Sequence, residues 1–431
     1  MRRLSADEGR VSVVSPDGCG CLESSIVGCL FCCHCCSSER LGSQMAFFPP
    51  RPPTYALMED VRGKIHARYT DGGSQITAGA RLAAFDATLV RTKRDNVVVV
   101  LSMDASASVV GDPRDAITLI VSHGNALDAA MFVPFGRRLR DALGVNIVLY
   151  DYSGYGVSSG APGVRDVYAD LEAVVDWCVD RKNFQPARIV LYGQSIGSAP
   201  TCGYAAKAGE AHDALVEDAT RAPSSSEKDG SHDGAKSRRG KTNKVAATPS
   251  PAGSGRSKSA RPHHSIGGVV LVSPIMSGLR VISGERPGCC APASVFAACD
   301  VFPNHEHAAK IRCPTLVVHG TADVQVPFRH GKTLFETLSR RSGDDGEKTP
   351  RHPEPYWVPG AGHDDVYERD PAAFIRELRG FLESVDRAAS ARETARGANG
   401  ADFNAVRDGA ERERARRDGG APVRVMEMTR D

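Results

Sequence analysis

The feature that most constrains this chain is a series of short apolar runs separated by segments of helical period. Runs of four to eight apolar residues, such as "NVVVVLSM" at Asn96–Met103, predict buried strands, and the longer amphipathic segments predict helices. Consecutive parallel strands need a crossover between them, which is usually a helix. The alternation therefore predicts an α/β fold with a mostly parallel central sheet and helices on both faces. The further predicted strands are Ala116–Ser122, Val145–Tyr152, Ala187–Gly193, Gly267–Ser273, Cys313–Gly320 and Glu354–Gly360, and the predicted helices are Asp128–Gly144, Val167–Arg181, Arg329–Arg341 and Pro371–Ser390.

Composition divides the rest of the chain into segments of different character. The stretch before His264 is rich in Ser, Gly, Lys, Arg and Pro, so it buries too little apolar surface to offset its ordering entropy. We predict a Cys-rich segment at 1–45, a Pro-rich connector at 46–81, an α/β domain at 82–208 and 265–388, a disordered basic insertion at 209–264, and a charged, disordered tail at 389–431. Between Met276 and Pro303 there is room only for a short cap over a site.

Charge and hydropathy exclude several classes of protein. The net charge of +2 gives no reason to expect a nucleic-acid partner. No apolar run reaches the length of a membrane-spanning helix. Asp7 and Glu8 fall where a secretory signal would need apolar residues, so we expect no signal peptide. The chain would then face the cytosol, where we expect its thiols to be reduced. No feature specifies an oligomeric state, and we expect a monomer.

The motif "GQSIG" at Gly193–Gly197 directly follows a predicted strand and precedes a predicted helix. This context is typical of a nucleophile elbow, a sharp turn that needs small flanking residues and projects the serine above the sheet edge. Ser195 is therefore the candidate nucleophile. The backbone N–H of Ile196 is the first candidate donor to an oxyanion.

A serine nucleophile needs a base, and the base needs a carboxylate that orients it. Asp323 and His363 each follow a predicted strand, in the chain order that this arrangement requires. His330 is an alternative base, but it falls early in a predicted helix. The candidate catalytic residues are Ser195, Asp323 and His363, and the reaction class is acyl transfer to water.

The segment "SHGNA" after the strand Ala116–Ser122 is where a second oxyanion donor is expected. The backbone N–H of Asn125 is our candidate, and His123 is interpreted as a brace for this loop. The sequence has no H-E-x-x-H motif and no Cys/His pairs at zinc spacing, so we expect no metal and no cofactor.

At this point the chain resembles a known family. The segments that carry the resemblance, in order, are "CLFCCHCC", "MAFFPPRPPTYAL", "VSHGNALD", "IVLYDYSGYGVSSG", "IVLYGQSIGS", "LVSPIMSGLRV", "FAACDVFPN", "LVVHGTADVQVPFRHG" and "WVPGAGHDDVY". They are similar to the α/β-hydrolase-domain 17 family of membrane-bound protein depalmitoylases. The resemblance covers roughly Cys29–Tyr55 and Leu82–Val385, apart from the insertion.

The resemblance implies an α/β-hydrolase fold and the catalytic triad Ser195, Asp323 and His363. It implies hydrolysis of the thioester that joins palmitate to protein cysteines, with S-palmitoylated proteins as substrates and no cofactor. It also implies a lipid-anchored protein on the cytoplasmic face of membranes, most of all the plasma membrane and endosomes. The residues that it implies to be S-palmitoylated are Cys29, Cys32, Cys33, Cys35 and Cys36.

Three readings compete for this cysteine cluster. A zinc site needs two pairs with a longer spacer, and disulfides need an oxidising compartment. S-acylation suits clustered cysteines beside Leu30, Phe31 and the apolar Met45–Phe48, and several acyl chains would give stable anchoring where one would not. We therefore expect the segment 1–45 to be an acylated membrane anchor.

Three functions remain in competition. The first is a membrane-anchored palmitoyl-protein thioesterase, and the second is a carboxylesterase or lipase that acts on small or lipid esters. Both use the same triad, so the sequence does not separate them. The third is an inactive membrane scaffold whose basic insertion (Lys236–Arg261) is a binding arm, and the complete set of catalytic residues argues against it.

Overall fold

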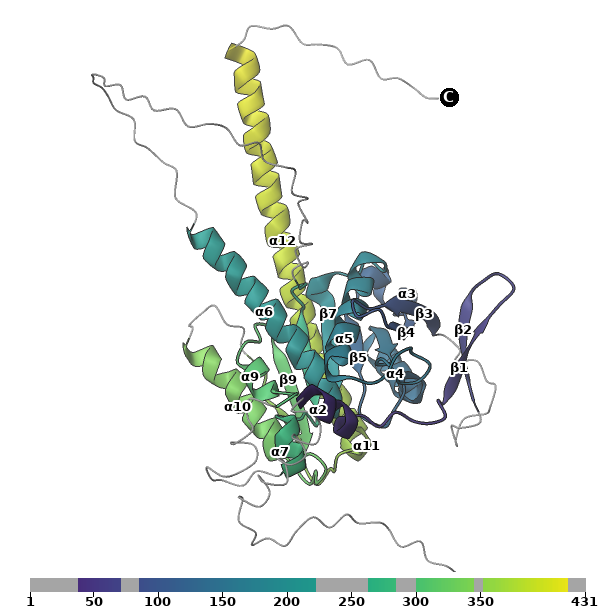
Figure 1. Cartoon of the computed structure of the whole chain (residues 1–431). Helices are drawn as coiled ribbons and strands as arrows, with labels where there is room; N and C mark the ends of the chain where they lie inside the picture. The colour runs from purple at the N-terminus through teal and green to yellow at the C-terminus, as the bar shows by residue number, and fades with distance from the viewer. Residues whose placement is uncertain (1–37, 71–84, 222–262, 284–299, 345–351, 418–431) are drawn as a thin grey trace, which may run out of the picture.

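A computed structural model describes residues 38–70, 85–221, 263–283, 300–344 and 352–417 of the chain (Figure 1). An eight-stranded sheet lies at its centre, with the strand order β10-β9-β8-β7-β5-β6-β4-β3. The strands are β3 (Asp86–Arg91), β4 (Val97–Met103), β5 (Thr118–Ser122), β6 (Asn146–Tyr150), β7 (Ile189–Gln194), β8 (Gly268–Val272), β9 (Thr315–Gly320) and β10 (Tyr356–Val358). The helices are α2 (Ser38–Ala46), α3 (Ala107–Val110), α4 (Ala129–Leu143), α5 (Val164–Asp180), α6 (Ser198–Arg221), α7 (Gly278–Ser283), α9 (Asn304–Ala308), α10 (Arg329–Asp344), α11 (Val366–Arg369) and α12 (Pro371–Arg417), with 3-10 turns η1 (Pro113–Asp115), η2 (Pro186–Arg188) and η3 (Ser195–Gly197).

Six neighbouring strands of the sheet pair in parallel, in the order β10, β9, β8, β7, β5 and β6. Strands β4 and β3 extend the sheet beyond β6 with antiparallel pairing. The predicted mostly parallel sheet is therefore confirmed, and each predicted strand has its counterpart in it. Because parallel strands end at the same edge, the loops that follow β5, β7, β9 and β10 gather on one side of the molecule.

The sheet is buried on both faces, which explains why its strands read as continuous apolar runs. Alternate residues of β4 enter two different core clusters: Val98 and Val100 pack with residues of α5 and α6, whereas Val99 and Leu101 pack with residues of α4 and α12. All four side chains are fully buried. The helices therefore cover the sheet from two sides, as the alternation of strands and helices predicts.

The predicted disordered insertion at 209–264 is wrong for residues 209–221, because α6 continues to Arg221. The extra length is fixed by a contact far along the chain: the Arg312 guanidinium donates to both carboxylate oxygens of Asp213, at 2.6 to 2.9 Å. Residues 222–262 of the predicted insertion lie outside the described residues.

The predicted boundary of the tail at 389 is also wrong, because α12 runs from Pro371 to Arg417 (Figure 1). Its middle part is held by Arg188, whose guanidinium is almost fully buried and donates to Asp386, Ser390 and Glu393. These partners lie about two hundred residues from Arg188 in sequence, so local pattern did not reveal them.

The predicted connector is more ordered than its proline content suggested. Strands β1 (Tyr55–Glu59) and β2 (Ile65–Tyr69) form an antiparallel hairpin, and Tyr55 and Ala67 are buried in the core. Helix α2 occupies the end of the predicted Cys-rich segment and packs on α5. The five cysteines of the predicted anchor lie outside the described residues.

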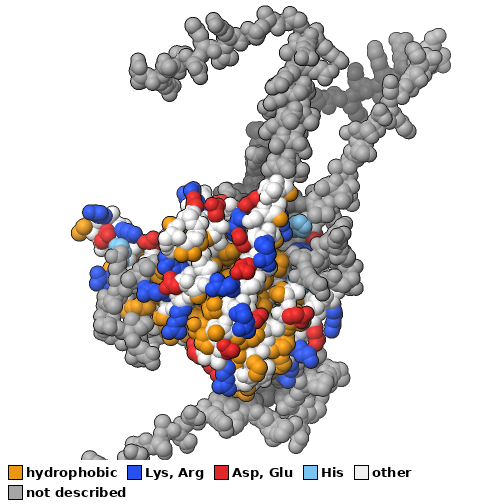
Figure 2. Space-filling model, turned by 180° about the vertical axis from the view of Figure 1, so that it is seen from behind, with side chains coloured by type: hydrophobic (Ala, Val, Ile, Leu, Met, Phe, Trp, Pro, Cys, Tyr) orange, Lys and Arg blue, Asp and Glu red, His pale blue; other side chains and the backbone are white. Residues whose placement is uncertain are grey.

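No helix in the described part of the chain is both long enough and apolar enough to span a membrane. On the face shown in Figure 2, the described residues show basic and acidic side chains interspersed among apolar ones, with no extended patch of one sign among them.

We expect Arg188→Ala to lower the free energy of unfolding by about 2 to 4 kcal/mol, because it leaves a cluster of acidic partners without their cation. Chemical denaturation of the two proteins measures the difference. Arg387→Ala is the control: that side chain is mostly exposed and lies 3.9 Å from Glu383 on the same helix, so it should change stability by less than about 0.5 kcal/mol. Equal effects of both substitutions would contradict the prediction.

Candidate active site

Ser195 directly follows β7 and has a left-handed backbone conformation, with φ of 52°. A non-glycine residue in this region is strained, and such strain persists only where the surroundings enforce it. Here Gly197 packs so closely on the end of β5 that a Cβ atom would lie 2.0 Å from the carbonyl oxygen of Ser122. A Cβ on Gly193 would lie 2.7 Å from the Gly197 oxygen. The two glycines thus allow the sharp turn that lifts Ser195 above the sheet edge.

The structure brings the three predicted catalytic residues together. The His363 Nε2 atom lies 2.9 Å from Ser195 Oγ, and His363 Nδ1 lies 2.7 Å from Asp323 Oδ2. These partners assign the tautomer in which Nδ1–H donates to the carboxylate and Nε2 accepts from the hydroxyl. The three residues come from the loops after β7, β9 and β10, at the carboxyl edge of the sheet.

Asp323 is buried and accepts several hydrogen bonds. Its Oδ1 accepts from the backbone N–H groups of Gln325 and Val326, at 3.0 and 2.9 Å, and its Oδ2 accepts from His363. Burial by itself would raise the pKa of Asp323, but hydrogen bonds from His319 and His363 and from the Val326 N–H outweigh it and hold the pKa below its ordinary value. The carboxylate therefore stays ionised beside the imidazole at neutral pH.

His319 is a residue of this site that sequence reasoning missed. It lies on β9, is fully buried, and its Nε2 atom is 3.2 Å from Asp323 Oδ2 and 2.9 Å from the Val326 oxygen. Among the described residues, none forms a hydrogen bond with the buried Nδ1 atom, and Gly331 packs against it. The spacing of four residues between His319 and Asp323 was the available signal, but in a strand followed by a turn it did not show that the side chains meet.

His330, the alternative base, has a different role. It is buried, and its Nδ1 accepts from the backbone N–H of Met276 at 3.1 Å. Burial lowers the pKa of His330 to about 4, so its imidazole is neutral at physiological pH. The hydrogen bond to Ser195 is made by His363 instead.

The turn after Ser195 is fixed by Ser198, the first residue of α6. The Ser198 hydroxyl donates to the Ser195 carbonyl oxygen at 2.6 Å and accepts from the N–H of Ile275 and the Asn304 side chain, both at 3.1 Å. Ile196 follows the nucleophile within η3, so its N–H lies at the start of the helical segment, where backbone donors are unpaired.

The β5–α4 loop (123–128) lies beside the elbow, since a Cβ atom on Gly124 would lie 3.9 Å from the Gln194 side chain. His123 is buried in this loop, its Nδ1 is 2.8 Å from the Gly124 oxygen, and its own carbonyl accepts from the Tyr152 hydroxyl at 2.7 Å. These bonds confirm the interpretation of His123 as a brace. Asn125, the predicted second oxyanion donor, uses its side chain to bind an N-terminal segment, at Ala46 and Phe48.

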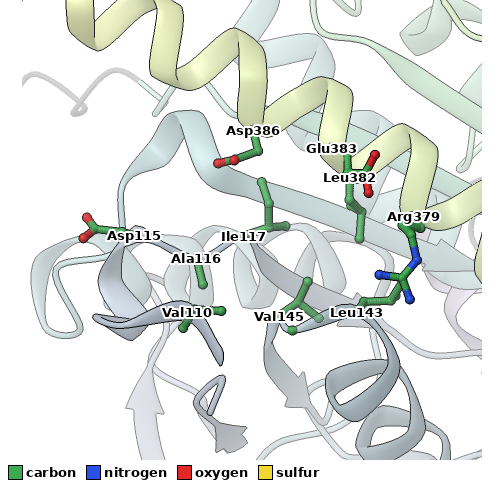
Figure 3. Close-up of a pocket in the computed structure, with 11 residues that line it drawn as sticks. Val110, Asp115, Ala116, Ile117, Leu143, Val145, Arg379, Leu382, Glu383 and Asp386 are labelled. Atoms are coloured by element: carbon green, nitrogen blue, oxygen red, sulfur yellow. The ribbon is translucent and has the colours of Figure 1, made fainter. Parts of the chain in front are cut away.

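A separate cavity of about 270 Å³ lies at the opposite edge of the sheet (Figure 3). It is lined by residues that precede β5 and β6, such as Ile117 and Val145, and by Arg379, Leu382 and Asp386 of α12. This cavity is therefore not part of the catalytic site. The region predicted to cap that site is described only at its two ends, because residues 284–299 lie outside the described residues.

Comparison with known proteins identifies the family of the chain. The family model described as "Alpha/beta hydrolase family" matches residues 119–377. The chain is 30% identical over 355 residues to the alpha/beta hydrolase domain-containing protein aho-3 of Caenorhabditis elegans, covering 82% of this chain and 81% of the relative. It is 30% identical over 347 residues to the human alpha/beta hydrolase domain-containing protein 17B, covering 80% of this chain and 92% of that protein. Among solved structures, the esterase Pf2001 of Pyrococcus furiosus matches with a TM-score of 0.44 at 16% identity, over 70% of this chain and 92% of that one.

We expect Asp323→Asn to lower kcat by about 10³- to 10⁴-fold, because an amide neither selects the reactive imidazole tautomer nor stabilises the imidazolium. Steady-state hydrolysis of a short p-nitrophenyl ester measures this. The native pKa of Asp323 lies below the unfolded value of about 3.9, so the ionised carboxylate contributes stability that is complete above about pH 4 and is lost as the pH falls through the native pKa. The stability difference between wild type and variant should therefore shrink below pH 4, and a difference independent of pH would contradict this account.

We expect His319→Leu to lower kcat roughly tenfold to a hundredfold, because Asp323 loses a donor that fixes its carboxylate. His319→Gln keeps an N–H donor near the position of Nε2 and should retain most of the activity. The same ester assay compares the two variants, and equal losses in both would show that only the imidazole volume matters.

Proposed function

This chain belongs to the α/β-hydrolase family, and we propose that it is a serine hydrolase that removes palmitate from S-acylated protein cysteines. The observation that carries the proposal is the hydrogen-bonded series Ser195–His363–Asp323 at the carboxyl edge of the sheet. A serine, a neutral imidazole and an ionised carboxylate in this order form the machinery for nucleophilic attack on an acyl carbon.

In the first half of the proposed reaction, Ser195 Oγ attacks the thioester carbonyl while its proton passes to His363 Nε2. Asp323 stabilises the imidazolium that results. The negative oxygen of the tetrahedral intermediate accepts hydrogen bonds from the N–H groups of Ile196 and Asn125. When the carbon–sulfur bond breaks, the cysteine thiolate takes the proton from His363, and the palmitoyl group remains on Ser195 as an ester.

In the second half, a water molecule takes the place of the thiol. His363 accepts a proton from this water as its oxygen attacks the Ser195 ester, and it returns the proton to Ser195 Oγ when the ester bond breaks. The products are palmitate and the free enzyme. Every proton is transferred through His363, so the cycle needs no other acid or base.

The choice of a protein-bound thioester rests on a resemblance in sequence. The run "CLFCCHCC" and the segments "DYSGYG" and "GQSIG" together resemble the depalmitoylase family. The cysteines Cys29, Cys32, Cys33, Cys35 and Cys36 are proposed to carry acyl chains and to hold the enzyme on the cytoplasmic face of the plasma membrane and endosomes. Such an anchor brings the enzyme to the surface where lipidated proteins reside.

The test is hydrolysis of a palmitoyl-cysteine peptide on detergent micelles by wild type and Ser195→Ala. We expect turnover by wild type and a loss of at least about 10³-fold in the variant, because no nucleophile remains. Free thiol release is the readout. The variant should keep the thermal stability of the wild type, which excludes unfolding as the cause.

Two other results would redirect the proposal. If wild type cleaves short esters or glycerides but not the palmitoyl peptide, the triad is retained and the substrate is an ester, as for a carboxylesterase or lipase. If an active-site fluorophosphonate fails to label Ser195 and neither substrate is cleaved, the chain is not a serine hydrolase.

A further inference from the structure

We propose that the segment Ala46–Phe48, called the N-terminal strap, positions the β5–α4 loop for catalysis through the side chain of Asn125. The inference rests on the proposed function, in which the Asn125 N–H binds the oxyanion. It assigns to the N-terminal segment a role in the chemical step, in addition to its proposed role in membrane attachment. Asn125 and Phe47 are then positioning residues.

The amide of Asn125 is the centre of the contact, since it uses both of its polar atoms to join three parts of the chain. Its Nδ2 donates to the Ala46 carbonyl oxygen at 2.7 Å. Its Oδ1 accepts from the Phe48 N–H at 3.0 Å, from the Tyr155 hydroxyl at 2.6 Å, and from the Ala126 N–H at 3.1 Å. The strap, the loop after β6 and the β5–α4 loop thus meet at one side chain.

The strap is held in place by packing as well as by hydrogen bonds. Phe47 is buried, with its ring edge-on to Tyr155 at 6.3 Å between centroids and to Phe302 at 6.0 Å. Just before the strap, the Ser43 hydroxyl of α2 accepts from the backbone N–H of Val164 at 3.1 Å. The strap is therefore packed against the domain, although the sequence predicted only a connector at residues 46–81.

The consequence for catalysis follows from the geometry of the loop. Asn125 carries its proposed oxyanion donor on the same residue whose side chain is fixed by the strap, and the next residue, Ala126, has a left-handed backbone with φ of 57°. That conformation is unfavourable for alanine and needs support from its surroundings. Without the strap the Asn125 side chain loses two of its partners, and the loop loses the contacts that would hold the Asn125 N–H in place for the oxyanion.

Oxyanion donors act only when they are preorganised, and a displacement of about 1 Å can cost up to about a hundredfold in rate. A substitution that weakens the contacts of the strap should therefore lower kcat and leave KM almost unchanged. The reason is that the oxyanion donor binds the transition state and not the bound substrate. A strap that served only as a tether would change neither constant for a substrate in solution.

The experiment uses the full chain and a water-soluble ester, p-nitrophenyl butyrate, so that membrane attachment has no influence. Phe47→Ala removes the buried ring, and Phe48→Ala is its matched control, because the neighbouring ring is 58% exposed and its backbone hydrogen bonds remain. We expect kcat per titrated active site to fall at least tenfold for Phe47→Ala, with KM within twofold of wild type, and to stay at the wild-type value for Phe48→Ala.

A second variant covers the case in which Phe47→Ala does not fold. Asn125→Asp keeps the size and the acceptor oxygens of the side chain but replaces the donor to Ala46 by a carboxylate, which repels that carbonyl. We expect a similar loss of kcat at unchanged melting temperature. A folded Phe47→Ala or Asn125→Asp protein with the wild-type kcat would overturn the proposal.

A third protein, in which the five cysteines Cys29, Cys32, Cys33, Cys35 and Cys36 are changed to serine, separates the strap from the anchor. It should keep the wild-type kcat on the soluble ester, and a loss equal to that of Phe47→Ala would overturn the proposal. If wild type cleaves this ester but no palmitoyl peptide, the proposed substrate fails while the test of the strap still stands. If wild type cleaves neither, the rate of fluorophosphonate labelling at Ser195 replaces kcat as the readout.

Discussion

The close approach of Gly197 to the end of β5 is the constraint on which the rest of the site depends. A hydrogen is the only side chain that fits there, because any Cβ would overlap the carbonyl oxygen of Ser122. This contact brings the turn after β7 down onto its neighbouring strand and forces Ser195 into a left-handed conformation. The side chain is thereby aimed at the space above the sheet, where loops from β9 and β10 bring their carboxylate and imidazole.

Asp323 and Ser195 differ in the number of hydrogen bonds that their side chains make. Asp323 is buried yet ionised because four N–H donors surround it, from His319, His363, Gln325 and Val326. These donors share its negative charge and fix the orientation of the carboxylate toward His363. Within the described part of the chain, the Ser195 hydroxyl makes one hydrogen bond, to the imidazole.

The parts of the fold and the site that could be predicted are those set by residues close together in the sequence. The central strands were predictable because burial on both faces makes them continuous apolar runs. Ser195, Asp323 and His363 could be proposed as catalytic residues because each lies in the turn or loop after such a strand. The extensions of α6 and α12 were not, since they depend on Arg312 and Arg188, far from them in sequence. The strap was missed for the same reason. The prolines that follow it, from Pro49 on, are typical of a connector, whereas the position of the strap is set by Asn125, 77 residues further along the chain.

The order of the strands along the chain also has a consequence for biosynthesis. Synthesis runs from the N-terminus, and Ser195 emerges 168 residues before His363, which follows the last strand of the sheet. A nascent chain can therefore form the elbow, the strap and the neighbouring strands while its serine still lacks both base and carboxylate. In the proposed mechanism, Ser195 becomes reactive only when β9 and β10 have joined the sheet, so hydrolytic activity would report completion of the domain. An incomplete chain on the ribosome would then carry Ser195 in an unactivated form.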